Sequence, residues 1–171
     1  MIPSLTTERL TLRPPCLADV PPYTAIMQSA RATHMGGPFS EEDTWLDFCA
    51  GVAGWHLRGY GMWSADLSET GEFVGMIFLH RDFGDPENEL GWILTEAAEG
   101  KGYAVEAALA AREYGYKTLG WETVVSYIDR ENQRSIKVAE RLDAVIDENA
   151  PRTKEHGDCL IYRHPKPEAL H

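Results

Sequence analysis

The most informative stretch of the chain is Glu99-Gly100-Lys101-Gly102-Tyr103-Ala104-Val105-Glu106-Ala107. It follows a segment that alternates like a strand and opens a segment with helical periodicity. Its two glycines permit a tight turn and a close approach of the backbone, and a helix start exposes unpaired N–H groups. Together with the helix dipole, these groups favour a phosphate or a pyrophosphate. On its own, the stretch is equally typical of a plain glycine-rich turn between a strand and a helix.

Two commoner phosphate motifs are excluded at the same positions. A P-loop requires Gly where Thr95 stands and Ser or Thr where Gly102 stands. A dinucleotide-binding fingerprint requires Gly or Ala in place of Val105 and a parallel βαβ start, whereas a meander precedes this turn.

The elements on either side of this turn predict an α/β or α+β domain with a mixed sheet. We expect helices over 17–30, from a cap at Ser40 to about 56, over 100–119 and over 132–142, with a loop at 34–38. Strands are expected at 10–12, 62–67, 73–80, 89–95, 123–128, 144–147 and 159–163. The strand, helix and strand between 89 and 128 predict a parallel crossover.

Composition limits the class of protein. The 171 residues fit one domain, 1–171, with a loose Pro-rich tail at 165–171. A net charge of -11 argues against a nucleic-acid-binding protein. No apolar run has the length of a signal peptide or a membrane span, so we expect no membrane association. Three cysteines without a C-x-x-C pair predict a reduced, cytoplasmic protein, and the histidines lack metal-ligand spacing, so no metal is expected.

Four motifs together resemble the GNAT superfamily of N-acetyltransferases, and within it most closely the branch that includes the ribosomal-protein N-terminal alanine acetyltransferases. They occur in the family's order and cover roughly residues 6–162. The motifs are Thr7-Glu8-Arg9-Leu10-x-Leu12-Arg13, Glu89-Leu90-Gly91-Trp92-Ile93-Leu94, Gly100-Lys101-Gly102-Tyr103-Ala104-x-Glu106-Ala107 and Asp129-x-x-Asn132-x-x-Ser135-x-x-Val138. The resemblance implies a central, mostly antiparallel mixed sheet of about seven strands flanked by four helices, with a splayed pair of strands at 89–95 and 123–128.

The resemblance also implies acetyl-CoA as the cofactor. The splayed strands would receive its pantetheine arm, and the backbone N–H of Leu94 would polarise the thioester carbonyl. The pyrophosphate would be held by backbone amides of Gly100, Lys101, Gly102, Tyr103 and Ala104. Two positions depart from the family pattern. Glu99 stands where Gln or Arg is usual, which by Coulomb's law predicts weakened rather than abolished binding. Leu142-Asp143-Ala144 stands where the family has Gly and an aromatic residue.

Transfer to an amine requires a neutral amine and a proton for the departing thiolate. An α-amino group titrates near about 8 and a lysine near about 10.4, so a base is needed. Glu89 is the candidate base; the alternative is that it is an exposed carboxylate on a strand, with no role in catalysis. Ser135 is the candidate partner of the thiol, or else a helix first-turn hydroxyl. Tyr127 is an alternative acid, or else a packing residue, and Asn132 is a candidate for pantetheine binding and for helix capping.

The acceptor pocket is implied by the resemblance to lie around the first two helices and their loop. Met35, Phe39 and Trp45 are candidates to line it, although aromatic residues at helical spacing are more often core. The sequence thus predicts an N-acetyltransferase that transfers an acetyl group by direct attack of a primary amine, either a protein N-terminus or a small molecule. The alternatives are a non-catalytic CoA-binding module and an enzyme for a longer acyl-CoA. A homodimer is implied by the resemblance alone.

Overall fold

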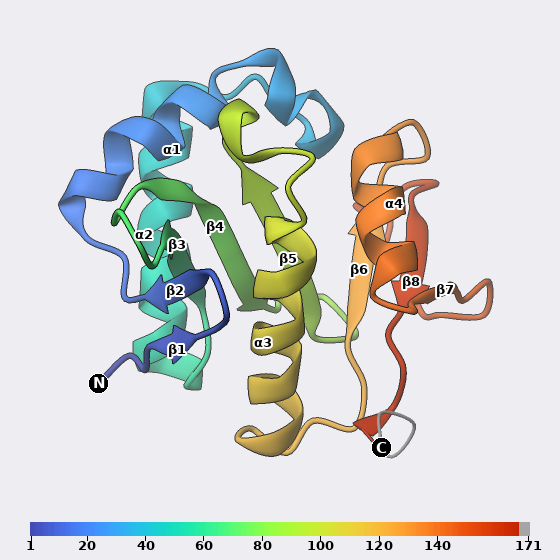
Figure 1. The fold of residues 1–171 in the computed structure, drawn as a ribbon. Coiled ribbons are helices and arrows are strands. Elements are labelled where there is room, and N and C mark those ends of the chain that lie inside the picture. Colours follow the sequence, from blue (N-terminus) through green and yellow to red (C-terminus); the bar gives the residue numbers. More distant parts are fainter. Residues whose placement is uncertain (168–171) are drawn as a thin grey trace.

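An eight-stranded sheet runs through the molecule, with helices on both of its faces (Figure 1). The computed structural model describes residues 1–167. The strand order is β1-β2-β3-β4-β5-β6-β8-β7, and only β5 and β6 are parallel. The strands are β1 (Leu5–Thr6), β2 (Leu10–Arg13), β3 (Met62–Leu67), β4 (Phe73–His80), β5 (Glu89–Leu94), β6 (Val125–Ile128), β7 (Val145–Ile146) and β8 (Leu160–Arg163). The helices are α1 (Val20–Met27), α2 (Glu41–Arg58), α3 (Tyr103–Lys117) and α4 (Gln133–Arg141).

The predicted mixed α/β architecture is confirmed, including the parallel crossover from β5 through α3 to β6. The sheet has one strand more than expected. Leu5–Thr6 forms this extra strand by pairing with β2, and two residues are too short for an alternation to be recognised. Part of the loose tail, 168–171, lies outside the described residues.

The helix expected over 17–30 is wrong in its extent. It is divided into a 3-10 turn at Leu17–Asp19, the helix α1 and a second 3-10 helix at Ala30–Met35. The break occurs because the Ser29 hydroxyl accepts a hydrogen bond from the Arg31 N–H and so caps a new turn, which the left-handed Gly36 ends. The loop expected at 34–38 is therefore wrong for its first two residues.

Small side chains bring α3 close to the sheet. Ala104, Ala107, Ala108 and Ala111 are buried against an apolar layer that includes Leu90 of β5. Burying a leucine side chain contributes about 1.5–3 kcal/mol and each alanine methyl about 0.8 kcal/mol, and together these contacts hold α3 on β4 and β5. The beginning of α3 is consequently held at the edge of β5 that faces β6.

The opposite face of the sheet is covered by α1 and α2. Tyr23 and Ile26 of α1 and Phe48 of α2 pack with Met76 and Ile93 of the sheet. As predicted, Ser40 caps α2: its hydroxyl accepts a hydrogen bond from the Asp43 N–H at 3.0 Å. Among residues 1–167, no helix has both the length and the apolar character needed to cross a membrane.

Candidate active site

The candidate site begins where β5 and β6 part. Their parallel register contains the single pair Glu89 and Val125, next to a hydrogen bond from the Val125 N–H to the Asn88 carbonyl at 3.1 Å. Beyond this point the strands diverge around a cavity of about 360 Å³. The beginning of α3 and one side of α4 complete its wall. The predicted splayed pair of strands is thus confirmed.

Alternate peptide groups of β5 point into this cleft. The Thr95 N–H donates to the Val74 carbonyl of β4 at 2.9 Å, and hydrogen-bonded pairs alternate along an antiparallel ladder. The peptide groups of Leu90, Trp92 and Leu94 therefore face away from β4 and toward the gap. The N–H groups of Trp92 and Leu94 are directed at whatever occupies the cleft.

The glycine-rich turn before α3 needs its glycines. Gly100 and Gly102 have φ angles of 73° and 82°, in the left-handed region that other residues enter at a cost of about 1–2 kcal/mol. The Glu106 N–H bonds to the Gly102 carbonyl at 3.1 Å. The N–H groups of 103–105 precede this first helical bond and so have no acceptor within α3. Free N–H groups at a helix start favour the approach of an anion, and these lie beside the cleft.

An interaction that the sequence did not reveal braces this turn from the N-terminal segment. The Thr7 hydroxyl and the Arg9 N–H donate to Oε1 of Glu106 at 2.6 and 2.7 Å, and the Arg9 guanidinium pairs with Oε2 at 2.7 Å. Arg9 also donates to the Lys101 carbonyl at 2.9 Å and lies over the Tyr103 ring. Burial raises the pKa of Glu106, but these bonds outweigh it and hold that pKa below its usual value. Two of the motifs therefore form one structural unit.

A buried chain of hydrogen bonds fixes the point where the strands part. Arg112 of α3 donates to the Leu142 carbonyl at 2.6 Å and to Nδ1 of His164 at 3.3 Å. Because arginine only donates, Nε2 of His164 carries the proton and donates to the Ser126 hydroxyl at 2.9 Å. Ser126 then donates to the Leu90 carbonyl at 2.6 Å. Burial, with the charge of Arg112, lowers the pKa of His164 to about 3, so its ring is neutral.

Glu89 lies at the closed end of the cleft and faces His80 of β4. The two residues are directly opposite in the antiparallel register, with Oε2 of Glu89 at 3.1 Å from Nε2 of His80. Burial lowers the pKa of His80, but the charge and hydrogen bond of Glu89 outweigh it and raise that pKa to about 9. The pair is therefore an ion pair at neutral pH.

Tyr127 of β6 also lines the cleft. Its ring stacks on His156 with centroids 4.0 Å apart, and its buried hydroxyl has no hydrogen-bond partner within residues 1–167. Burial and the nearby carboxylates of Asp85 and Glu89 raise the pKa of Tyr127 well above its usual value. Its hydroxyl therefore stays protonated at neutral pH.

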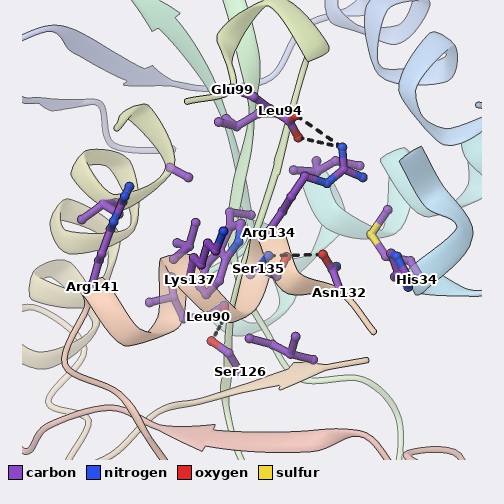
Figure 2. A pocket seen from close by; sticks show the side chains of 18 of the residues that line it. His34, Leu90, Leu94, Glu99, Ser126, Asn132, Arg134, Ser135, Lys137 and Arg141 are labelled. Atoms are coloured by element: carbon purple, nitrogen blue, oxygen red, sulfur yellow. Dashed lines mark hydrogen bonds and ion pairs between the residues drawn. The ribbon is translucent and has the colours of Figure 1, made fainter. Parts of the chain in front are cut away.

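At the start of α4, the structure shows a cap. Oδ1 of Asn132 accepts a hydrogen bond from the Ser135 N–H at 3.2 Å (Figure 2). The capping role predicted for Asn132 is confirmed, and both residues also line the cleft.

The three residues predicted to line the acceptor pocket, Met35, Phe39 and Trp45, do not all lie at the same cavity. A second cavity of about 500 Å³ lies on the α1 and α2 side and is lined by Met35 and Phe39. Met35 also lines the cleft, as do Phe78 and Ile93, so the two cavities adjoin. Trp45 stacks on Phe48 on the outer side of α2, is 44% exposed and lines neither cavity.

Most of the residues predicted for catalysis and cofactor binding are brought together around the cleft. Lys101 is not part of its lining and instead presents its carbonyl to Arg9. Those that line the cleft are Glu89, Leu94, Gly100, Gly102, Tyr103, Ala104, Tyr127, Asn132 and Ser135.

Residues 9–145 match the family described as an acetyltransferase (GNAT) domain. The chain belongs to the GNAT acetyltransferase family. It is 30% identical to the uncharacterized protein YkkB of Bacillus subtilis, with 81% of this chain and 83% of YkkB covered. It is 46% identical to the acetyltransferase from Agrobacterium tumefaciens str. C58, whose crystal structure superposes with a TM-score of 0.91 over 96% of this chain and 95% of that chain. RimJ of Mycobacterium smegmatis, in complex with CoA-disulfide, shares the fold with a TM-score of 0.74 at 17% identity, covering 99% and 90% of the two chains.

As a member of the GNAT family, the protein is an acetyl-CoA-dependent acyltransferase, as the sequence predicted. The cleft fits coenzyme A on its own geometry. The helix start at 103–105 offers N–H groups to phosphates, and the N–H groups of Trp92 and Leu94 lie further along the gap.

Proposed function

We propose that this GNAT enzyme transfers the acetyl group of acetyl-CoA to a primary amine, a protein N-terminus or a small-molecule amine, that enters from the α1 and α2 side of the sheet. The observation that carries the proposal is the position of Glu89. Its carboxylate lies at the fork of β5 and β6, next to the cleft on one side and, through His80, next to the second cavity on the other.

The coenzyme supplies the acetyl group as a thioester, and the chain supplies positioning and proton transfer. The amides of Gly100, Gly102, Tyr103 and Ala104 hold the pyrophosphate, and Asn132 binds the pantetheine amides. The Leu94 N–H, which faces the gap, polarises the thioester carbonyl. Binding in this arrangement places the acyl carbon near the fork, where an amine can reach it.

Glu89 accepts the proton of the attacking amine, directly or through water. An α-amino group, with a pKa near about 8, is partly neutral at pH 7, whereas a lysine near about 10.4 depends more strongly on this base. Ser135 of α4 and Tyr127 of β6 are the candidates to give a proton to the departing thiolate, since both line the cleft.

The acceptor occupies the second cavity, with Met35 and Phe39 in contact with it. This placement rests on the adjoining walls of the two cavities, in which Met35 takes part on both sides. Trp45 lies outside both cavities, and the proposal assigns it no contact with the acceptor.

The first test is thermal unfolding with acetyl-CoA, free CoA and ADP. A ligand at about a hundred times its Kd adds roughly 2.7 kcal/mol to the free energy of unfolding. For a chain of this size, the Tm should rise by about 5–10 °C. No shift with millimolar acetyl-CoA would contradict the proposal.

The second test is the pH dependence of acetyl transfer in Glu89→Gln. Loss of the base should lower kcat/KM more at pH 6.5 than at pH 9, because the neutral amine becomes abundant as the pH rises. Glu122→Gln, which removes an exposed carboxylate away from the cleft, should leave the profile unchanged. Equal losses at both pH values would remove Glu89 from the proton transfer.

A further inference from the structure

Three charged side chains from separate segments meet at the glycine-rich end of the cleft. Glu99 pairs with Arg31 of the 3-10 helix Ala30–Met35 and with Arg134 of α4. Arg134 directs Nη1 at both carboxylate oxygens, at 3.2 and 3.3 Å, and Figure 2 shows it extending from α4 toward Glu99. All three residues line the cleft, and Gly100 follows immediately in the chain.

Arg31 is held from two sides. Its guanidinium donates to the Leu94 carbonyl through Nε and Nη2, at 3.3 and 3.1 Å, and Nη2 also donates to Glu99. Its side chain is 18% exposed, against 32% for Glu99 and 53% for Arg134. Arg31 is therefore fixed in the wall, whereas Arg134 reaches across the cleft from more open surroundings.

This arrangement changes the electrostatic effect expected of the carboxylate of Glu99. Taken alone, a negative charge there repels a pyrophosphate. With two arginines bound to it, the group of three carries a net charge of +1. Each guanidinium has five N–H donors in a planar fork suited to phosphate, and the contacts to Glu99 and Leu94 use only part of them.

We propose that Glu99 is a positioning residue that holds Arg31 and Arg134 as ligands of the diphosphate of coenzyme A. The two guanidiniums add charged donors to the backbone N–H groups at the beginning of α3, from either side of the gap. A carboxylate can bind both arginines at once, which fixes two long side chains before the ligand arrives and reduces the entropy lost on binding. The inference rests on the proposed use of the cleft for the coenzyme.

The direction in which one substitution changes CoA affinity distinguishes this positioning role from simple repulsion. If Glu99 only repels the diphosphate, Glu99→Gln tightens CoA binding. If Glu99 positions the arginines, the same change weakens it, because a neutral amide has one acceptor oxygen and loses the charge-assisted bonds. Glu96→Gln is the matched control. It removes an identical charge three residues earlier, at an exposed position outside the cleft lining.

The experiment measures the Kd of CoA by calorimetry for the wild type, Glu99→Gln, Glu96→Gln, Arg134→Gln and the double variant Glu99→Gln/Arg134→Gln. Pantetheine, which has no phosphate, is the second ligand, and the Tm without ligand checks folding. We expect Glu99→Gln and Arg134→Gln each to weaken CoA binding about tenfold, with pantetheine binding unchanged and Glu96→Gln within about twofold of wild type. The double variant should bind CoA more weakly than either single variant. Its fold-loss relative to wild type should, however, be smaller than the product of the two single fold-losses, because the two residues act through one contact.

The possible results differ in what they overturn. Unchanged or tighter CoA binding by Glu99→Gln overturns the positioning role. An equal loss of pantetheine and CoA binding also overturns it, since the defect then does not concern the diphosphate. A wild type that binds neither ligand contradicts the proposed function instead.

Discussion

The ion pair between Glu89 and His80 predicts a stability difference that depends on pH. In the folded protein the pKa of His80 is about 9, against an ordinary value of 6.5. A group whose pKa rises on folding stabilises the folded state fully below its unfolded pKa. That stabilisation is lost as the pH increases through the folded pKa. For His80 it is thus complete below about pH 6.5 and declines up to about pH 9.

Removing the carboxylate should remove this contribution. In Glu89→Gln the pKa of His80 should fall sharply, because burial, which lowers it, is then opposed only by Asp82 and Asp85. A rise from 6.5 to about 9 corresponds to about 3 kcal/mol, since each whole step of pKa is worth about 1.4 kcal/mol. The side chains of His80 and Glu89 are 27% and 15% exposed, so solvent screens the pair only in part.

Urea unfolding at pH 6 and at pH 10 measures the effect. The free energy of unfolding of Glu89→Gln should be about 3 kcal/mol below that of the wild type at pH 6 and nearly equal to it at pH 10. Comparing the two proteins at each pH cancels the titration of the other groups. Glu122→Gln should match the wild type at both pH values. A difference of the same size at pH 6 and pH 10 would refute the ion pair.

Two further substitutions test the geometry of the cleft. Gly102→Ala should reduce the free energy of unfolding by about 1–2 kcal/mol and weaken CoA binding, because alanine is strained at a φ of 82°. Urea unfolding measures the first effect and titration with CoA the second, and wild-type affinity for CoA would argue against a rigid anion-binding turn. Ser126→Ala should cost about 1–3 kcal/mol, because it leaves the buried His164 N–H and the Leu90 carbonyl without their partner; unchanged urea unfolding would show that this chain of bonds contributes little.

The strands and helices were predictable where burial produces a regular period. The strands at Met62–Leu67 and Phe73–His80 have the predicted bounds, because turn residues separate two apolar runs. The small residues along α3 indicated a close approach to the sheet, and the four alanines are buried there. The position of the cleft followed from the resemblance, since no local pattern shows that two parallel strands separate.

The polar contacts that shape the site were not predictable in the same way. Glu106 meets Arg9 across 97 positions of sequence, and Arg112 meets His164 across 52. A side chain that bonds a distant partner leaves no period in its own neighbourhood. Arg9 and Glu106 therefore stood in two separate motifs with nothing to predict their contact, and neither Arg112 nor His164 was singled out. Glu99 illustrates the consequence for function. Read from its position alone, its charge opposes a pyrophosphate.

The same charge has the opposite effect once its neighbours are placed. Arg31 and Arg134 come from segments on the two sides of the gap, and neither stands near Glu99 in the sequence. The energy of a charge depends on the charges within a few ångströms, which the fold sets and the motif does not. A departure from a family motif is therefore no measure of lost function until the three-dimensional surroundings of the altered residue are known. At position 99, the carboxylate that taken alone would repel the diphosphate instead holds the side chains of Arg31 and Arg134 beside the cleft.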